Sequence, residues 1–192
     1  GMRLDRFVQQ EIYALLGIRE LFFNALDASP VPRNYAATER CAWRGGVLSG
    51  AVHDDNAYVL NGVAGHAGLF GTARAVFALL RALLAAYCKE TPPGLFAPGQ
   101  VRTFWTSSDA SGWTLGFDTP SKQGSSSGTY FSPTSIGHLG FTGTSFWTDI
   151  ERRITIILLT NRVHPSRANE KIRAFRPRIH DEIMKGLLNM AD

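Results

Sequence analysis

The sequence predicts an α+β fold, an antiparallel sheet flanked by helices. Residues 72–88 and 167–189 repeat apolar side chains at helical spacing, which indicates two amphipathic helices. Between them, residues 144–148 and 153–161 are rich in β-branched and aromatic side chains and flank a polar turn at 149–152. Two such runs around a short turn are typical of a β-hairpin. We therefore expect a sheet built on this hairpin, with helices packed against it.

The ends of the helices carry recognisable signals. Residues 4–16 form a shorter amphipathic helix, and Gly17 suits its C-terminal cap. Thr72 is a suitable N-cap for the central helix, and Pro92 and Pro93 stop that helix.

The C-terminal helix is predicted to be amphipathic, with Pro177 as a point of interruption or kinking. Its apolar residues fall on one stripe: Ile172, Phe175, Ile179, Ile183 and Leu187. The stretch Arg162–Lys185 is also basic, which allows a nucleic-acid surface. Because Phe175 alone interleaves an aromatic ring with these charges, a solvated helix face is favoured and no nucleic-acid partner is expected.

The strand Ile154–Thr160 is apolar on both alternating faces, so we expect it to be central in its sheet. Residues 18–60 are expected to be irregular, since Pro30 and Pro32 exclude a long early element. Residues 106–135 are rich in Ser, Gly and Thr and are expected to form a surface loop between short strands, with Gly112–Asp118 as one of those strands.

Composition supports a packed domain. The chain has 192 residues, of which 44% are hydrophobic, and we expect a single domain over residues 1–192 with Gly1 as a tag remnant. Residues 2–17 are not expected to be a signal peptide, and there is no charge-free run of about 18 residues, so the chain as given is expected to be soluble, cytoplasmic and off the membrane. Cys41 and Cys88 are expected to be free thiols.

Two segments together resemble one family. GVAGHAGLFGTA, at residues 62–73, resembles the glycine-rich turn that opens a helix in class C β-lactamase-related serine hydrolases, esterases and penicillin-binding-protein-like enzymes. HLGFTGTSFWTDIERRITIILLTNRVHP, at residues 138–165, resembles their closing hairpin, and VHDDNA upstream fits an esterase-like branch. The resemblance implies an incomplete β-lactamase/transpeptidase-like domain and hydrolysis of an amide or ester through an acyl-enzyme.

The same resemblance assigns candidate site residues. The family's third motif, K-T-G or H-T-G, corresponds here to His138-Leu139-Gly140. By carry-over, His138 takes the cationic or donor position, Gly140 leaves room for the substrate backbone, and the Phe141 N–H is an oxyanion donor. Leu139 departs from the usual Thr and lacks the hydroxyl that would bind a substrate carboxylate, which disfavours a penicillin substrate. A cleft role and a purely structural role both remain open for His138.

The family's nucleophile motif, S-x-x-K, does not occur in these 192 residues. Three positions before the four lysines stand Ala86, Thr119, Ala168 and Glu182. Tyr130-Phe131-Ser132 resembles the second motif only superficially and is interpreted as loop. In the family both motifs precede the helix that residues 2–17 resemble, so we expect no catalytic residue in this chain and no activity from it alone. It is then a fragment of a hydrolase, one half of a two-chain enzyme, or a non-catalytic binding or scaffold protein.

Other polar residues have plainer explanations. His66 is expected to be buried and bonded to loop carbonyls, and His53 with Asp54 and Asp55 to cap and turn the chain. Their spacing does not match a known metal motif, so neither a metal nor a cofactor is expected. Arg162 and His164 are expected to close the end of the strand before them.

The expected partners are a small amide or ester and a second copy of the chain. Without the family's upstream strands and helix, the strand Ile154–Thr160 loses a neighbour and exposes an apolar edge. We therefore expect a two-fold homodimer in which Ile154, Ile156 and Leu158 lie on antiparallel strands paired with their own copies.

Overall fold

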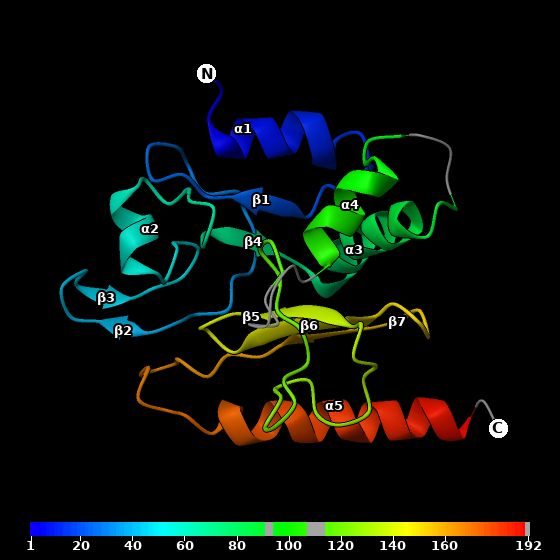
Figure 1. Cartoon of the computed structure of the whole chain (residues 1–192). Helices are drawn as coiled ribbons and strands as arrows, with labels where there is room; N and C mark the ends of the chain where they lie inside the picture. Colours follow the sequence, from blue (N-terminus) through cyan, green and yellow to red (C-terminus); the bar gives the residue numbers. More distant parts are fainter. Residues whose placement is uncertain (91–93, 107–113, 191–192) are drawn as a thin grey trace. The chain divides into compact units, whose positions relative to one another are not determined.

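The computed structural model describes residues 1–90, 94–106 and 114–190. The chain divides into two compact units. Unit 1 contains residues 1–79 and 160–169, and unit 2 contains residues 80–159 and 170–192. Figure 1 colours the helices and strands along the sequence, and the boundary between the units falls within helix α3 (Ala73–Tyr87). The expectation of a single domain stays a prediction.

Unit 1 begins with the predicted N-terminal helix, in two parts. The α-helix α1 spans Leu4–Val8 and continues as the π-helix η1, Gln9–Tyr13. Gly17 follows with a φ of 69°, the left-handed conformation expected of a glycine at a helix end. The buried side chains of this region are Tyr13, Ile18 and Leu21, packed against the start of helix α3 (Ala73–Tyr87). The amphipathic pattern of residues 4–16 is therefore confirmed.

Residues 18–60 are more ordered than expected. Strand β1 (Leu21–Phe23) pairs antiparallel with β4 (Leu69–Gly71), and β2 (Arg40–Cys41) pairs with β3 (Gly46–Val47). Helix α2 (Asp55–Val59) follows. These elements are short, from two to five residues, and so lack the length over which periodicity becomes visible in a sequence.

The glycine-rich segment before α3 makes the tight turns that its composition predicts. Gly68 has a φ of 105°, and a Cβ built there would lie 2.3 Å from the carbonyl oxygen of Gly62. Only glycine allows this approach of two backbone segments. Directly afterwards the hydroxyl of Thr72 accepts from the Ala75 N–H at 3.2 Å, which confirms Thr72 as the N-cap of α3.

Unit 2 is built on a three-stranded antiparallel sheet in the order β5–β6–β7. Strand β5 spans Ile136–Leu139, β6 spans Thr144–Asp149 and β7 spans Ile154–Leu159. The β6–β7 hairpin confirms the predicted pairing. The prediction that Ile154–Thr160 is central in its sheet is wrong for the described residues, because β7 pairs on one side only, with β6. Of its six residues only Ile156 is buried, and no strand of the described residues pairs with its outer edge.

Each face of this sheet carries its own part of the core. On one face, Phe146 and Ile136 pack with Trp105 of α4 (Pro98–Trp105) and with Ala86 near the end of α3. On the other face, Trp147 and Ile156 pack with Met184 of α5 (Ile172–Asn189). Figure 1 shows α5 running along this second face. Helix α4 is absent from the prediction; it has only eight residues.

Helix α5 begins at Ile172, five residues later than predicted, and ends at Asn189 as predicted. It continues through Pro177, but it buries a different row of residues. The buried side chains are Ile172, Arg176, His180 and Met184. Of the predicted stripe, only Ile172 is buried, whereas Phe175, Ile183 and Leu187 are exposed. The physical reason lies in the sheet end beneath the helix, where backbone carbonyls and a serine hydroxyl need hydrogen-bond donors.

Two further sequence predictions concern thiols and membranes. Cys41 and Cys88 are both free, as expected. Among the residues that the structure describes, no helix is long and apolar enough to cross a bilayer.

Candidate functional site

Strand β5 carries the predicted third motif at one edge of the sheet of unit 2. In the antiparallel register His138 lies opposite Phe146, and Gly137 lies opposite Trp147. A Cβ on Gly137 would lie 2.4 Å from the Trp147 side chain, so the glycine makes room for this fully buried indole. His138 is exposed and lies on the sheet face opposite α5, as its pairing with Phe146 requires. The edge-strand position and the exposure were both expected; the role in a cleft stays a prediction.

The motif ends in a tight turn between β5 and β6. The Gly140 N–H donates to the Thr144 carbonyl at 2.8 Å, and the Gly143 N–H donates to the Gly140 carbonyl at 3.1 Å. A Cβ on Gly140 would lie 2.0 Å from the Thr144 hydroxyl oxygen, so a larger residue here would force the Thr144 side chain to move. The turn projects Phe141, whose side chain is 59% exposed. Gly140 thus has a local structural reason beside the substrate-binding role carried over from the family.

Arg176 holds this turn from beneath. Its Nη2 atom donates to the carbonyl oxygens of Gly140 at 2.7 Å and of Thr144 at 2.8 Å. The arginine is buried, and these two partly buried bonds fix the two ends of the turn together. Sequence reasoning missed Arg176 because its charge was assigned to the solvated face of the helix. A signal was present in its spacing, four residues after Ile172 and four before His180, on the row that the helix buries.

Asp118 is a second residue that sequence reasoning missed. Its backbone pairs with Gly137 through two hydrogen bonds, of 2.7 and 2.9 Å, and so covers the outer edge of β5 beside His138. Burial raises the pKa of the Asp118 carboxyl, while the Thr119 N–H and the charge of His138 act in the opposite direction. Of the predicted strand Gly112–Asp118, the residues before Thr114 lie outside the described residues, and Asp118 alone forms a β-bridge.

His180 of α5 lies near the hydroxyl of Ser145, but both side chains are buried and a substrate could not reach them. His180 Nε2 lies 3.5 Å from the Ser145 hydroxyl, and His180 Nδ1 lies 2.9 Å from the Ser126 carbonyl. Burial lowers the pKa of His180, although the Ser126 carbonyl opposes this shift. Both side chains are below 5% exposed, so we interpret the pair as part of the core.

Ser132 is likewise structural, which agrees with its interpretation as loop. Its N–H and hydroxyl donate to the two carboxylate oxygens of Asp149, at 3.0 and 2.9 Å. Asp149 is fully buried and also accepts from the Arg152 N–H and guanidinium, at 2.9 and 2.7 Å. Burial alone would raise the pKa of Asp149, but these four donors outweigh it and lower the pKa.

The polar residues singled out in unit 1 form an ion-pair network. Glu39 accepts from Arg167 at 2.6 Å and lies 3.0 Å from His53 Nε2. Arg167 chiefly, with His53, lowers the pKa of Glu39 to about 2. Asp54 caps α2 by accepting from the Ala57 N–H at 2.7 Å, which confirms its predicted capping role.

The prediction for His66 is wrong, and that for the segment after β7 holds. The His66 side chain is 53% exposed, and its Nε2 lies 3.1 Å from Asp54 Oδ1 instead of a loop carbonyl. Arg162 donates to the carbonyls of Arg167 and Asn169, and His164 Nδ1 contacts the Thr38 carbonyl at 2.8 Å; both tie down the chain after the strand.

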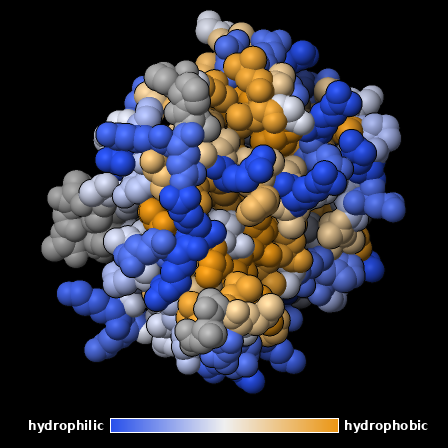
Figure 2. Space-filling view, turned by 90° about the vertical axis from the view of Figure 1, so that its right-hand side faces the viewer, coloured by the Kyte–Doolittle hydropathy of each residue, from blue (hydrophilic) through white to orange (hydrophobic). Residues whose placement is uncertain are grey.

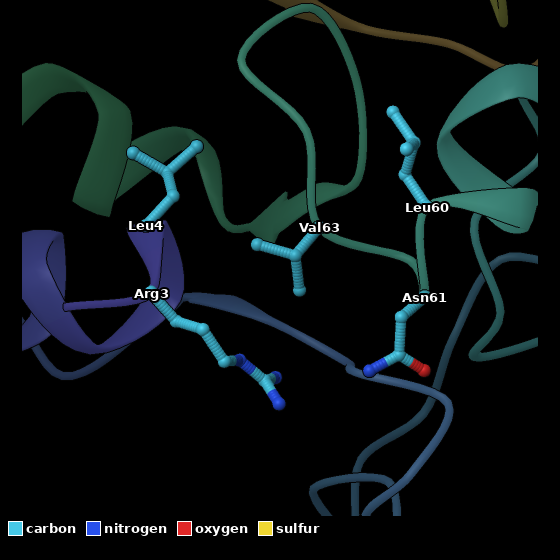
Figure 3. A pocket seen from close by; sticks show the side chains of 5 residues that line it. All are labelled: Arg3, Leu4, Leu60, Asn61 and Val63. Atoms are coloured by element: carbon cyan, nitrogen blue, oxygen red, sulfur yellow. The ribbon is translucent and has the colours of Figure 1, made fainter. Parts of the chain in front are cut away.

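Unit 1 also contains a cavity of about 260 Å³, lined by Arg3, Leu4, Leu60, Asn61 and Val63. Figure 3 shows these side chains arranged around it, from the start of α1 and from the segment after α2. The Arg3 guanidinium is already engaged by Asp5 and Asp27, each at 2.8 Å. No predicted site residue lines this cavity. Within the described residues there is also no group of three His, Cys, Asp or Glu side chains placed to hold a metal ion.

Comparison with known proteins supplies the family. A family model named beta-lactamase matches residues 1–177. A protein of Escherichia coli K12 that carries the provisional name D-alanyl-D-alanine carboxypeptidase is 36% identical over 186 residues, covering 85% of this chain and 41% of that protein. An N-acetylmuramyl-L-alanine amidase of Bacillus subtilis is 32% identical over 189 residues, covering 85% and 40% respectively. The chain therefore spans about two fifths of the length of these relatives.

Solved structures share the fold at low sequence identity. A beta-lactamase from Mycobacterium bovis superposes with a TM-score of 0.59 at 17% identity, covering 97% of this chain and 57% of that one. Simvastatin synthase from Aspergillus terreus gives a TM-score of 0.61 at 16% identity, covering 94% and 50%. At such identities the likeness concerns the fold alone.

Proposed function

The chain belongs to the beta-lactamase family of serine hydrolases, and we propose that it forms the third-motif side of an acyl-enzyme active site. In this proposal Phe141 supplies an oxyanion N–H, Gly140 leaves space for substrate, and His138 donates to a polar group of the substrate. The observation that carries the proposal is the exposed His138 on edge strand β5, next to a turn fixed by Arg176.

The nucleophile is proposed to come from polypeptide outside these 192 residues. Within them S-x-x-K does not occur, and the relatives are more than twice as long as the matched region. A serine with its lysine is needed to attack the carbonyl and to form the acyl-enzyme. The present residues would then hold and polarise the substrate without forming a bond to it.

The proposed substrate is an amide or an ester other than a penicillin. Leu139 stands where a hydroxyl would bind a carboxylate, and its apolar side chain cannot replace that hydrogen bond. An ester, or an amide without a carboxylate at this position, suits a leucine better. A change of this one residue therefore tests the substrate class.

The DNA upstream of Met2 tests the origin of the nucleophile. An in-frame S-x-x-K followed by Y-x-N supports the proposal in a single polypeptide, and a neighbouring reading frame with both motifs supports it in two chains. Neither motif in the neighbourhood would contradict the proposal and leave a non-catalytic binding or scaffold protein.

The roles of the site residues are then tested by measuring kcat/KM for variants of the enzyme that contains this upstream segment. His138→Ala is expected to lower kcat/KM for a p-nitrophenyl ester by about 100-fold, the scale of one lost transition-state donor. His66→Ala, which removes an exposed histidine whose imidazole contacts Asp54, is the matched control and should leave the rate unchanged. Leu139→Thr should improve turnover of a penicillin relative to the ester. Equal rates for the His138 and His66 variants would refute the carry-over.

A further inference from the structure

Arg176 of α5 is a buried cation beneath the β5–β6 turn. A charged side chain in such a place is rare and needs hydrogen-bond partners, whereas exposed apolar residues are common on folded proteins. Figure 2 shows apolar residues of this second kind at the surface among hydrophilic ones. The partners of Arg176 therefore identify a site more specifically than the apolar surface does.

A single nitrogen of Arg176 bonds two backbone carbonyls. Its Nη2 atom donates to the carbonyl oxygen of Gly140 at 2.7 Å and to that of Thr144 at 2.8 Å. This nitrogen carries two hydrogens, so one N–H is available for each carbonyl. The Gly140 carbonyl also accepts from the Gly143 N–H, at 3.1 Å. Two donors, one from the helix and one from the turn itself, thus hold the Gly140 carbonyl in place.

The direction of the Gly140 carbonyl fixes the direction of the Phe141 N–H, because both groups belong to one planar peptide unit. The bond between these two residues is trans, and in a trans peptide the C=O and the N–H point in opposite directions. With the carbonyl held by Arg176, the Phe141 N–H is therefore directed away from α5. The side chain of His138 also lies on the sheet face opposite α5.

We propose that Arg176 is a positioning residue, which sets the direction of the Phe141 N–H as an oxyanion donor. The effect on catalysis rests on the proposed function, whereas the direction of the N–H is a property of the turn. An oxyanion donor is effective when it is already aimed at the position where negative charge develops. Loss of Arg176 removes one donor to the Gly140 carbonyl and lets this peptide plane turn.

The same hydrogen bond also strengthens the N–H as a donor. Hydrogen bonds in a chain polarise one another, so a cation that donates to a carbonyl makes the N–H of the same peptide a stronger donor. The guanidinium of Arg176 keeps its charge at any pH at which the protein is folded, and the residue is 7% exposed. Its charge is thus conveyed to the oxyanion position through one peptide unit, without contact between Arg176 and the substrate.

Residual dipolar couplings of the 192-residue chain measure the direction of the Phe141 N–H. In the wild type the coupling should fit the structure, with the amides of β5 and β6 as the reference frame. It should deviate in Arg176→Met, which removes both bonds, and be largely restored in Arg176→Lys, which keeps a charged donor. If Arg176→Met does not fold, Arg176→Gln should show a smaller deviation. Arg178→Met, on the exposed side of α5, is the matched control and should leave the coupling unchanged.

The consequence for catalysis is measured in the enzyme that contains the upstream segment. Arg176→Met should lower kcat for a p-nitrophenyl ester by about 10- to 100-fold and change KM by less than about threefold, because an oxyanion donor acts mainly in the transition state. Arg176→Lys should recover most of this loss, and Arg178→Met should match the wild type. A residue that only stabilised the fold would lower Tm and leave kcat of the folded enzyme unchanged.

The couplings and the kinetics separate the outcomes. A Phe141 coupling that is the same in the wild type and in Arg176→Met would overturn the proposal, whatever the kinetics. A reoriented N–H with an unchanged kcat, in an enzyme that His138→Ala impairs, would also overturn it. An enzyme in which His138→Ala and Arg176→Met are both as active as the wild type would instead contradict the proposed function itself and leave Arg176 with a role in the turn alone.

Discussion

One carboxylate in each unit fixes segments that are distant in sequence, and the two carboxylates do so differently. Glu39 of unit 1 is 12% exposed and is held by the long side chain of Arg167, with His53 beside it. Asp149 of unit 2 is fully buried, and two of its four donors are backbone N–H groups. Backbone donors lose little further freedom when they bond, whereas the arginine must be ordered. The comparison indicates that Asp149 contributes more to stability.

The two carboxylates also serve different parts of the molecule. Asp149 joins the turn after β6 to the loop that leads into β5, the strand with the third motif. Glu39 joins residues 160–169 to the segment around β2. A change at Asp149 should therefore reach the candidate site, and a change at Glu39 should not.

Isosteric amides at the two positions test this difference most strongly. Asp149→Asn should lower the free energy of unfolding by about 3 kcal/mol, because an amide NH₂ replaces an acceptor in front of buried donors. Glu39→Gln should cost about 1 kcal/mol or less, the range of partly exposed ion pairs. Urea unfolding measures both. Equal costs would break the comparison.

Arg176 provides the next largest effect, within unit 2 alone. Arg176→Met should cost about 2 kcal/mol, since the carbonyls of Gly140 and Thr144 lose a buried donor. Hydrogen exchange should accelerate at residues 140–144. The matched control is Arg178→Met on the exposed side of the same helix, expected to change stability by less than about 0.5 kcal/mol. Unchanged exchange in the turn would show that Arg176 does not hold it.

The pH dependence of stability gives a smaller effect and tests the lowered pKa values of the two carboxyl groups. The pKa of Glu39 is lowered to about 2, and the pKa of Asp149 is lowered as well. A lowered carboxyl pKa stabilises the fold above the unfolded value of about 4, and this contribution is lost as pH falls through the folded pKa. The urea midpoint should thus decrease from pH 5 toward pH 2. Each amide variant should show a shallower decrease, and a wild-type midpoint independent of pH would be inconsistent with both shifts.

The sequence predicted the elements whose residue pattern repeats over many positions, and it missed the features that depend on one tertiary contact. Helix α3, the β6–β7 hairpin and the existence of helix α5 follow from patterns that extend over many residues. The buried row of α5 could not be read in this way, because Arg176 and His180 are buried by the carbonyls and hydroxyl that they meet. Strand β1 is likewise set by its pairing partner β4, which lies far along the chain.

The residues of the candidate site likewise include some that the sequence predicted and some that it missed. His138, Gly140 and Phe141 could be identified from a contiguous motif on a predicted strand. Asp118 and Arg176, which cover the edge of that strand and fix its turn, come from a loop and from a distant helix. Their proximity arises only when the sheet has formed.

Covalent labelling tests most directly the claim that the chain contributes the third-motif side without a nucleophile. The purified chain is incubated with a penicillin and, separately, with a fluorophosphonate, and its intact mass is measured. The account predicts an unmodified mass with both reagents, because loss of the nucleophile and its base costs about 10⁶ in rate. A complete, stoichiometric adduct on any serine of the chain would contradict it.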